Sequence, residues 1–243
     1  MSTIFGVPVD AAYYLVSGLT GILTPVAGSL AAVAAIIAVT MAVRALLMRF
    51  SLRALREQAV AARLAPELAA LRQRYAKQPE RLQSEMSALY RREGTSMFAG
   101  ITPLLIQWPF LSVMYLLFRS PRVAGKVNTL LTHDLFGVPL GMHWLSGAGP
   151  ASWHGAVFAG LFVLLAGLCW LTSRLARLTA AQATASSGAG AGAALAKVLA
   201  YLTVVIAAFA PLAAGIYLLT SLAWSLAERV LFLRCSREPA LTP

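Results

Sequence analysis

One arginine stands inside a long apolar run of the sequence. The run from Pro25 to Phe50 reads PVAGSLAAVAAIIAVTMAVRALLMRF and contains Arg44. An arginine near the middle of a membrane helix costs about 2.5–3.5 kcal/mol, so such a residue usually faces a bundle interior or a water-filled cavity. Thr40 precedes Arg44 by four residues, and both project from one helix face. The pair predicts the wall of a polar groove. The alternative is that Arg44 extends along the helix to the nearby cytosolic surface.

Sequence motifs of enzymes are absent. The chain contains no HExxH, no GxSxG and no glycine-rich phosphate loop. Glu228, beside Arg229, is the only carboxylate near a predicted span, and no second carboxylate is placed to relay protons or bind a cation. We therefore expect neither covalent catalysis nor a cofactor. The polar residues of the spans are scattered, which favours a wet groove that tolerates many sequences: Thr40, Arg44, Gln107, Ser112, Thr203, Thr220 and Ser221.

The histidines and cysteines do not form a recognisable site. His133, His143 and His154 are not at a known metal-ligand spacing, and surface or interfacial positions are expected for them. Cys169 falls in an apolar span and Cys235 near the inner surface, so the two are not expected to form a disulfide or a metal site.

Composition predicts an all-α polytopic membrane protein. The 243 residues are 59% hydrophobic and 12% charged, with a mean hydropathy of +0.73. A helical span needs about 20 apolar residues. Five segments qualify as expected spans, although the fourth is short. They are residues 26–50, 96–118, 153–173, 195–210 and 211–233.

Basic residues predict the orientation of these spans. Sixteen Lys or Arg residues fall in segments 49–92, 174–197 and 229–237, and three fall in the segment 119–126. The side rich in Lys and Arg is normally cytosolic. The N-terminus is therefore expected outside and the C-terminus inside, and the net charge of +11 is mostly a topology signal rather than a sign of nucleic-acid binding. The inner surface would favour anionic lipids.

Residues 51–95 form the largest polar segment and predict a cytosolic helical hairpin. Pro79 and Glu80 suit the first turn of a second helix, and Pro66 with Glu67 marks an earlier start. A passive connector is the alternative. Apolar residues recur at helical spacing on both sides of Pro79, at Leu64, Leu68, Leu71 and Tyr75 and then at Leu82, Met86 and Leu89.

The remaining segments are expected to be short or irregular. Residues 1–25 lack the basic start of a cleavable signal peptide and carry Asp10 there. They are expected either to form a short helix along the outer interface, around Tyr13 to Leu19, or to be an unstructured lead-in. The other expected elements are an outer loop (119–152), a flexible Gly-rich inner loop (174–194) and a short cytosolic tail (234–243).

Several ordered stretches resemble the YidC/Oxa/Alb family of membrane protein insertases. They are the pair Val43–Arg44, the LAPEL segment around Pro66, the basic LRQRYAK, the hairpin end ALYRREG and the second-span start AGITPLLIQWPF, with a weaker match at PLAAGIYLLTSL. The resemblance covers about residues 25–233.

The resemblance implies five spans around a hydrophilic groove that opens to the cytosol and the lipid. It also implies that the hairpin, with Pro66, Tyr75 and Met86, receives substrate. The partners implied are nascent membrane proteins in the bilayer of a bacterial plasma membrane, with the Sec translocon and ribosome as further partners. The groove positions it implies are Arg44, Thr40, Gln107, Tyr217 and Ser221.

Some positions depart from the family pattern. Leu218 follows Tyr217 where a second aromatic is common, Leu222 replaces an asparagine, and Glu228 replaces a glutamine. These changes make the wall contributed by the last span less polar. The short tail also weakens the expectation of ribosome docking.

Two other functions fit a polytopic protein of this composition. A small-solute transporter or channel is the main alternative, although transporters commonly show repeated halves and no internal repeat is visible here. An assembly chaperone that acts only beside another complex is the second alternative.

Overall fold

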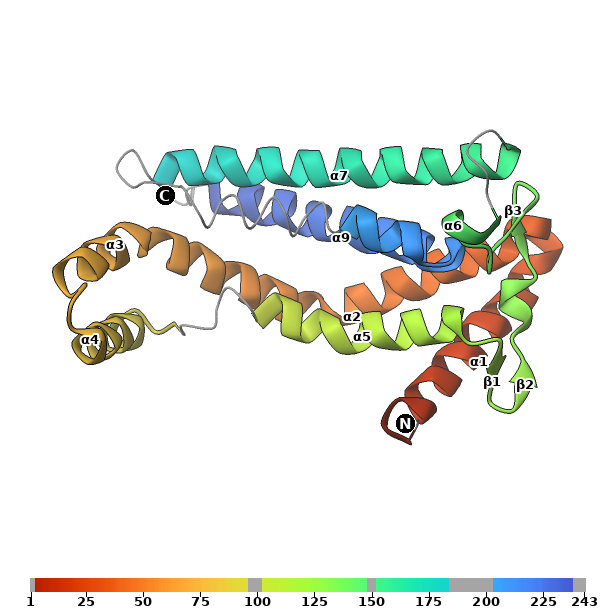
Figure 1. Ribbon diagram of the computed structural model, residues 1–243, viewed down its shortest axis with the longest axis horizontal. Coiled ribbons are helices and arrows are strands. Elements are labelled where there is room, and N and C mark those ends of the chain that lie inside the picture. Colours follow the sequence, from red (N-terminus) through yellow and green to blue (C-terminus); the bar gives the residue numbers. More distant parts are fainter. Residues whose placement is uncertain (1–2, 96–101, 148–151, 184–202, 238–243) are drawn as a thin grey trace, which may run out of the picture.

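The computed structural model describes residues 3–95, 102–147, 152–183 and 203–237. The described chain is mostly helical, with two small β-hairpins at one end (Figure 1). The long helices are α1 (Thr3–Ala27), α2 (Ala31–Arg63), α5 (Thr102–Arg119), α7 (Trp153–Ala183) and α9 (Leu212–Arg237), and the shorter ones are α3 (Ala65–Arg74) and α4 (Pro79–Arg92).

Three described helical segments are long and apolar enough to cross a membrane. They are Gly6–Ala61, Trp153–Leu175 and Leu212–Arg234. The first combines α1 and α2 across the short 3₁₀ helix η1 (Gly28–Leu30). The sequence predicts two more spans, at residues 96–118 and 195–210. Residues 96–101 of the first and 195–202 of the second lie outside the described residues. The described parts are α5 in the first and the helical residues 203–209 in the second. The chain is thus a helical integral membrane protein with at least these three candidate spans.

The N-terminal helix α1 is longer than the short helix expected near Tyr13. It is a continuous helix of 25 residues that ends before Gly28, whose φ of +53° suits a glycine at a helix terminus. One face is buried because Val9, Tyr13 and Val16 pack into the main hydrophobic core. Packing of this face stabilises the helix beyond what local propensity provides.

The main core lies where α1, α2, α5, α7 and α9 meet. Small residues let α2 approach its neighbours, and Ala31, Ala32 and Ala35 are fully buried. The start of α9 and the two residues before it are the most buried segment among the described residues, since every residue from 210 to 218 is buried. Gly215 allows α7 and α9 to lie close together, because a Cβ there would be 2.5 Å from Cδ2 of Leu161.

The loop between α5 and α7, which is predicted to be the outer loop, folds over one end of the helices. It contains β1 (Arg122–Val123) paired with β2 (Lys126–Val127), η2 (Thr129–Leu131), β3 (Asp134–Leu135) paired with β4 (Val138–Pro139), and α6 (Trp144–Gly147). Asn128 is buried and its amide donates to the carbonyls of Leu117 at 2.7 Å and Ser120 at 3.0 Å, which caps the end of α5.

The same loop is tied to α9 and α1. The carbonyls of Met142 and Leu140 accept from the first two amides of α9, at 2.9 and 3.0 Å. Asp10 on α1 accepts from the amide of Ala124 at 3.0 Å. The bonds from Met142 and Leu140 satisfy amides at the start of α9 that would otherwise lack a partner within the helix. Among the described residues, no cluster of three His, Cys, Asp or Glu side chains could hold a metal.

The helices α3 and α4 form a hairpin at the opposite end of the molecule (Figure 1). Leu64, Leu68 and Leu89 form a small separate core, with Val60, Leu71, Met86 and Tyr90 packed against it. Arg63–Glu93 at 3.2 Å and Arg92–Glu67 at 3.7 Å connect the elements at the surface. Because this core is small and the ion pairs are exposed, the hairpin gains little stability from either.

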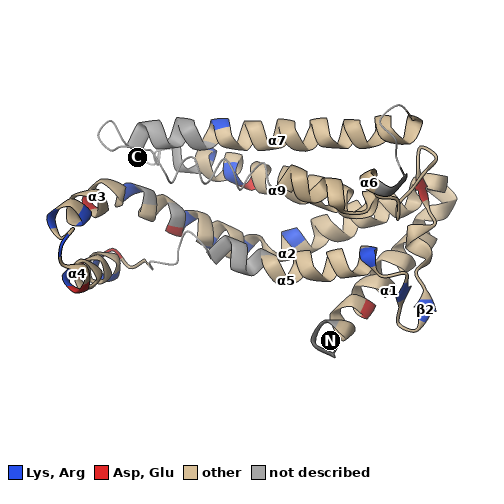
Figure 2. Ribbon diagram, in the orientation of Figure 1, with Lys and Arg blue, Asp and Glu red and all other residues tan. Residues whose placement is uncertain are grey.

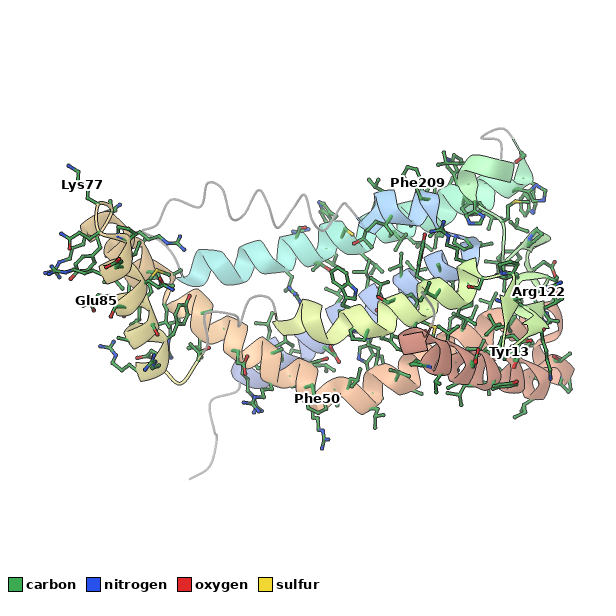
Figure 3. All side chains as sticks on the ribbon, turned by 60° about the horizontal axis from the view of Figure 1, so that its bottom comes forward. Tyr13, Phe50, Lys77, Glu85, Arg122 and Phe209 are labelled. Atoms are coloured by element: carbon green, nitrogen blue, oxygen red, sulfur yellow. The ribbon has the colours of Figure 1, made fainter. Side chains whose placement is uncertain are left out.

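Charged residues gather at the hairpin end (Figure 2). Lys77 and Glu85 mark that end in Figure 3, whereas Tyr13 and Arg122 mark the other. The long apolar helices run between the two, so the described chain has a charged end, an apolar middle and a looped end.

Candidate functional site

A polar seam lies between α2 and α9, which pack together and run in the same direction (Figure 1). Each helix contributes polar side chains at intervals of about one or two turns. On α2 these are Thr40, Arg44 and Ser51, and on α9 they are Tyr217, Ser221, Trp224 and Glu228. Residues four, seven and eleven apart share a helix face, which is why each set points toward the other helix.

Arg44 is the central residue of this seam. Its side chain is directed across to α9, where the guanidinium donates a hydrogen bond to Oγ of Ser221. Only 8% of the residue is exposed. A snorkelling arginine would instead leave its guanidinium exposed at the end of the stem. The geometry therefore places the charge inside the helix bundle.

Thr40 and Tyr217 lie beside Arg44. Thr40 is fully buried, and its hydroxyl donates to the carbonyl of Ile36 at 2.7 Å within α2. Tyr217 is 1% exposed, and its ring packs edge-on against Phe110 of α5 with centroids 5.5 Å apart. The buried Tyr217 hydroxyl lies near both Ser221 and Arg44.

Gln107, the groove position expected on α5, has its backbone in that helix, and its side chain lies outside the described part of the chain. The structure thus brings Thr40, Arg44, Tyr217 and Ser221 together, and α5 borders them through Phe110.

Glu228 is a member of the seam that sequence reasoning did not assign to it. It is 6% exposed, and its Oε1 accepts from Nε1 of Trp224 at 2.7 Å. Ser51 of α2 lies beside the carboxylate, and Arg44 is within electrostatic range. The signal was present in the spacing, because Glu228 follows Ser221 by seven residues on the same helix face.

The predicted hairpin positions lie apart from this seam. Pro66 occupies the first turn of α3, Tyr75 follows the last residue of that helix, and Met86 packs against the small hairpin core. The Arg74 guanidinium lies over the Tyr75 ring, 5.6 Å from its centroid. The seam and the hairpin are thus two separate candidate sites connected by α2.

The arrangement of the seam suits binding of an anion. A guanidinium has five N–H donors in a planar fork that matches a carboxylate. Ser221 accepts from one terminal nitrogen of Arg44 and carries no charge. The seam therefore combines a buried positive charge and neighbouring neutral hydroxyls with the Glu228 carboxylate farther along α9.

Comparison with known protein families identifies the family of this chain. The family model described as 60Kd inner membrane protein matches residues 22–238, which include both the seam and the hairpin. The chain belongs to this family. The match covers most of the chain and confirms the family expected from the sequence.

Several relatives of this chain carry the name membrane protein insertase YidC. The chain is 30% identical over 105 residues to the protein of that name from Clostridium tetani, covering 43% of the chain and 48% of the relative. It is 33% identical over 93 residues to the Clostridium perfringens protein, covering 38% of the chain and 39% of the relative. A Marinomonas relative is 32% identical over 93 residues, covering 38% of the chain and 17% of the relative. Each match spans about half, or less, of the relative's length.

Proposed function

We propose that this protein is a membrane protein insertase and that it performs no covalent chemistry. Family membership and the printed names of the relatives support the class. The observation that carries the proposal within this chain is Arg44, a buried cation that contacts a neutral hydroxyl on α9. Such a charge is costly in a membrane helix and generally marks a functional path.

The proposed path is a hydrophilic groove between the spans, lined by Thr40, Arg44, Gln107, Tyr217 and Ser221. The groove hydrates the polar outer segment of a substrate within the inner leaflet and shortens the apolar layer that the segment must cross. Arg44 attracts acidic residues of that segment, and weak screening inside the bundle strengthens the attraction. Five spans enclose this groove in the proposed arrangement.

The free energy comes from the substrate itself. Moving a helix of about 20 apolar residues from water into lipid is favourable by tens of kcal/mol at the usual area coefficient, so no nucleotide is required. The membrane potential adds about 2.3 kcal/mol for each acidic charge moved outward across 100 mV.

The hairpin is proposed to receive the nascent chain first. It lies at the end of the molecule where charged residues gather (Figure 2), and its own core is small. The excess of Lys and Arg on this side favours a cytosolic location, with the N-terminus outside and the C-terminus inside. The ribosome and the Sec translocon are proposed partners at this surface.

Reconstitution tests the proposal. The purified protein is placed in liposomes with a small single-span substrate, and protease protection measures insertion. We expect insertion without other proteins, at a rate well above that of empty liposomes. Insertion only after a Sec translocon is added would instead indicate an assembly chaperone. Absence of insertion under both conditions would refute the proposed function.

A further inference from the structure

Glu228 places a carboxylate inside the seam that also contains Arg44. The residue is 6% exposed, and a buried carboxylate is costly unless its oxygens are satisfied. Trp224 donates to Oε1 at 2.7 Å, and Ser51 of the neighbouring helix lies beside the same group. The carboxylate is therefore held in place by neutral donors.

The two opposite charges act on one another without direct contact. Arg44 bonds to Ser221, and among the described residues it belongs to none of the ion pairs within 4.0 Å. Glu228 follows Ser221 by seven residues, which corresponds to about 10 Å along the helix axis. The carboxylate lowers the positive potential at Arg44 without forming an ion pair with it, so most of the guanidinium donors stay available.

An acidic substrate residue that approaches Arg44 meets both charges. Arg44 attracts it, while Glu228 repels it with little screening. A neutral substrate residue is neither attracted by Arg44 nor repelled by Glu228. The difference in rate between acidic and neutral substrates therefore depends on Glu228 as well as on Arg44.

We propose that Glu228 is a resident counter-charge that sets how strongly Arg44 selects acidic substrate segments, and that Trp224 holds its carboxylate away from the guanidinium. This role deepens the proposed insertase function and rests on it. Glu228 and Trp224 are in this view specificity-determining residues that act together with Arg44.

Two substitutions separate this role from a structural one, because they change the ratio of acidic to neutral insertion rates in opposite directions. Glu228→Gln removes the charge and should raise the ratio about threefold to tenfold, the range expected when one like charge is removed from a partly screened site. Trp224→Phe removes the donor and lets the carboxylate reach Arg44, so the ratio should fall below that of the parent protein.

Two further variants serve as controls. In an Arg44→Ala background, Glu228→Gln should still raise the ratio, because Glu228 repels the acidic residue directly. The ratio should nevertheless stay below that of Glu228→Gln alone, because the attraction of Arg44 is missing. Thr220→Val alters another polar residue of α9, whose hydroxyl donates within the helix to Ile216 at 2.9 Å. This variant should leave the ratio at the parent value.

The experiment uses the full chain in liposomes and one single-span substrate with an acidic or a neutral outer segment. A higher ratio for Glu228→Gln and a lower one for Trp224→Phe would support the inference. An unchanged ratio for Glu228→Gln would overturn the inference, and so would an equal fall in the insertion rates of both substrates in both variants. In either case, insertion by the parent protein would still support the proposed function. If Glu228→Gln does not fold, the direction of the Trp224→Phe change decides. A parent protein that inserts neither substrate would refute the proposed function and this inference with it.

Discussion

The guanidinium of Arg44 on α2 donates a hydrogen bond to the hydroxyl of Ser221 on α9, 177 positions later in the chain. Both residues are almost fully buried. The bond joins two helices that run in the same direction and gives the buried cation a neutral partner. The charge of Arg44 is therefore available to a ligand of opposite sign.

Substitution of Arg44 should affect acidic substrates most. Arg44→Lys keeps the charge and should retain most activity, although it loses the planar fork. Arg44→Ala should slow insertion of a substrate with an acidic outer segment about tenfold, because the attraction in a weakly screened site is lost. A paired rate assay with acidic and neutral versions of one substrate measures the effect. Rates equal to those of the parent protein on both substrates would remove Arg44 from the mechanism.

Gly215 should tolerate no larger side chain without adjustment of α7. A Cβ at this position meets the end of the Leu161 side chain at 2.5 Å, so Gly215→Val should lower the free energy of unfolding by about 1–3 kcal/mol, as overpacking usually does. Thermal unfolding in detergent measures the change. Gly215→Ala should have a smaller effect that Leu161→Ala partly relieves.

Gly160 provides the matched control for this prediction. It lies next to Leu161 on α7, and a Cβ there would meet nothing within 4 Å. Gly160→Ala should leave the melting temperature unchanged or raise it, because alanine is the better helix former. Equal losses in Gly160→Ala and Gly215→Ala would contradict the close approach of α7 and α9.

The hairpin should contact substrate before the seam does. Photocrosslinkers at Tyr75 or Met86 should capture stalled nascent chains of shorter length than a crosslinker at position 44. A crosslinker at Thr132 in the outer loop serves as the control and should capture none of the short chains. Simultaneous or reversed order would make the hairpin a connector.

Deletion of residues 66–92 should slow insertion and leave the spans folded. The hairpin has its own small core, which is separate from the main core of the long helices. The melting temperature of the remaining protein should therefore change little. Loss of the folded spans would show that the hairpin stabilises them.

Cysteine labelling should locate the hairpin in the cytosol. In a variant without Cys169 and Cys235, Ser84→Cys on α4 should react with an impermeant reagent only after the cells are opened. Thr132→Cys in the exposed outer loop should react in intact cells. The excess of Lys and Arg beside the hairpin is the physical reason for this orientation. Labelling of Ser84→Cys in intact cells would reverse the topology.

Local rules were sufficient for several features of this chain. Pro79 opens α4 and Pro66 lies in the first turn of α3, because proline lacks the N–H that those positions do not use. Thr40 and Arg44 share a face because residues four apart do so in any α-helix. Composition indicated membrane spans, since long apolar helices satisfy their backbone hydrogen bonds internally. The ordered motifs around Arg44 and Pro66 indicated the family.

Tertiary packing decided what these features face. Nothing local places Ser221 against Arg44, because the choice of partner depends on how α2 and α9 pack. The same packing buries Glu228 inside the seam. It also extends α1 from the expected short helix to 25 residues, since burial of one face stabilises turns that propensity alone does not. A sequence fixes helical periodicity over a few residues, whereas the environment of a buried charge depends on residues far apart in the chain.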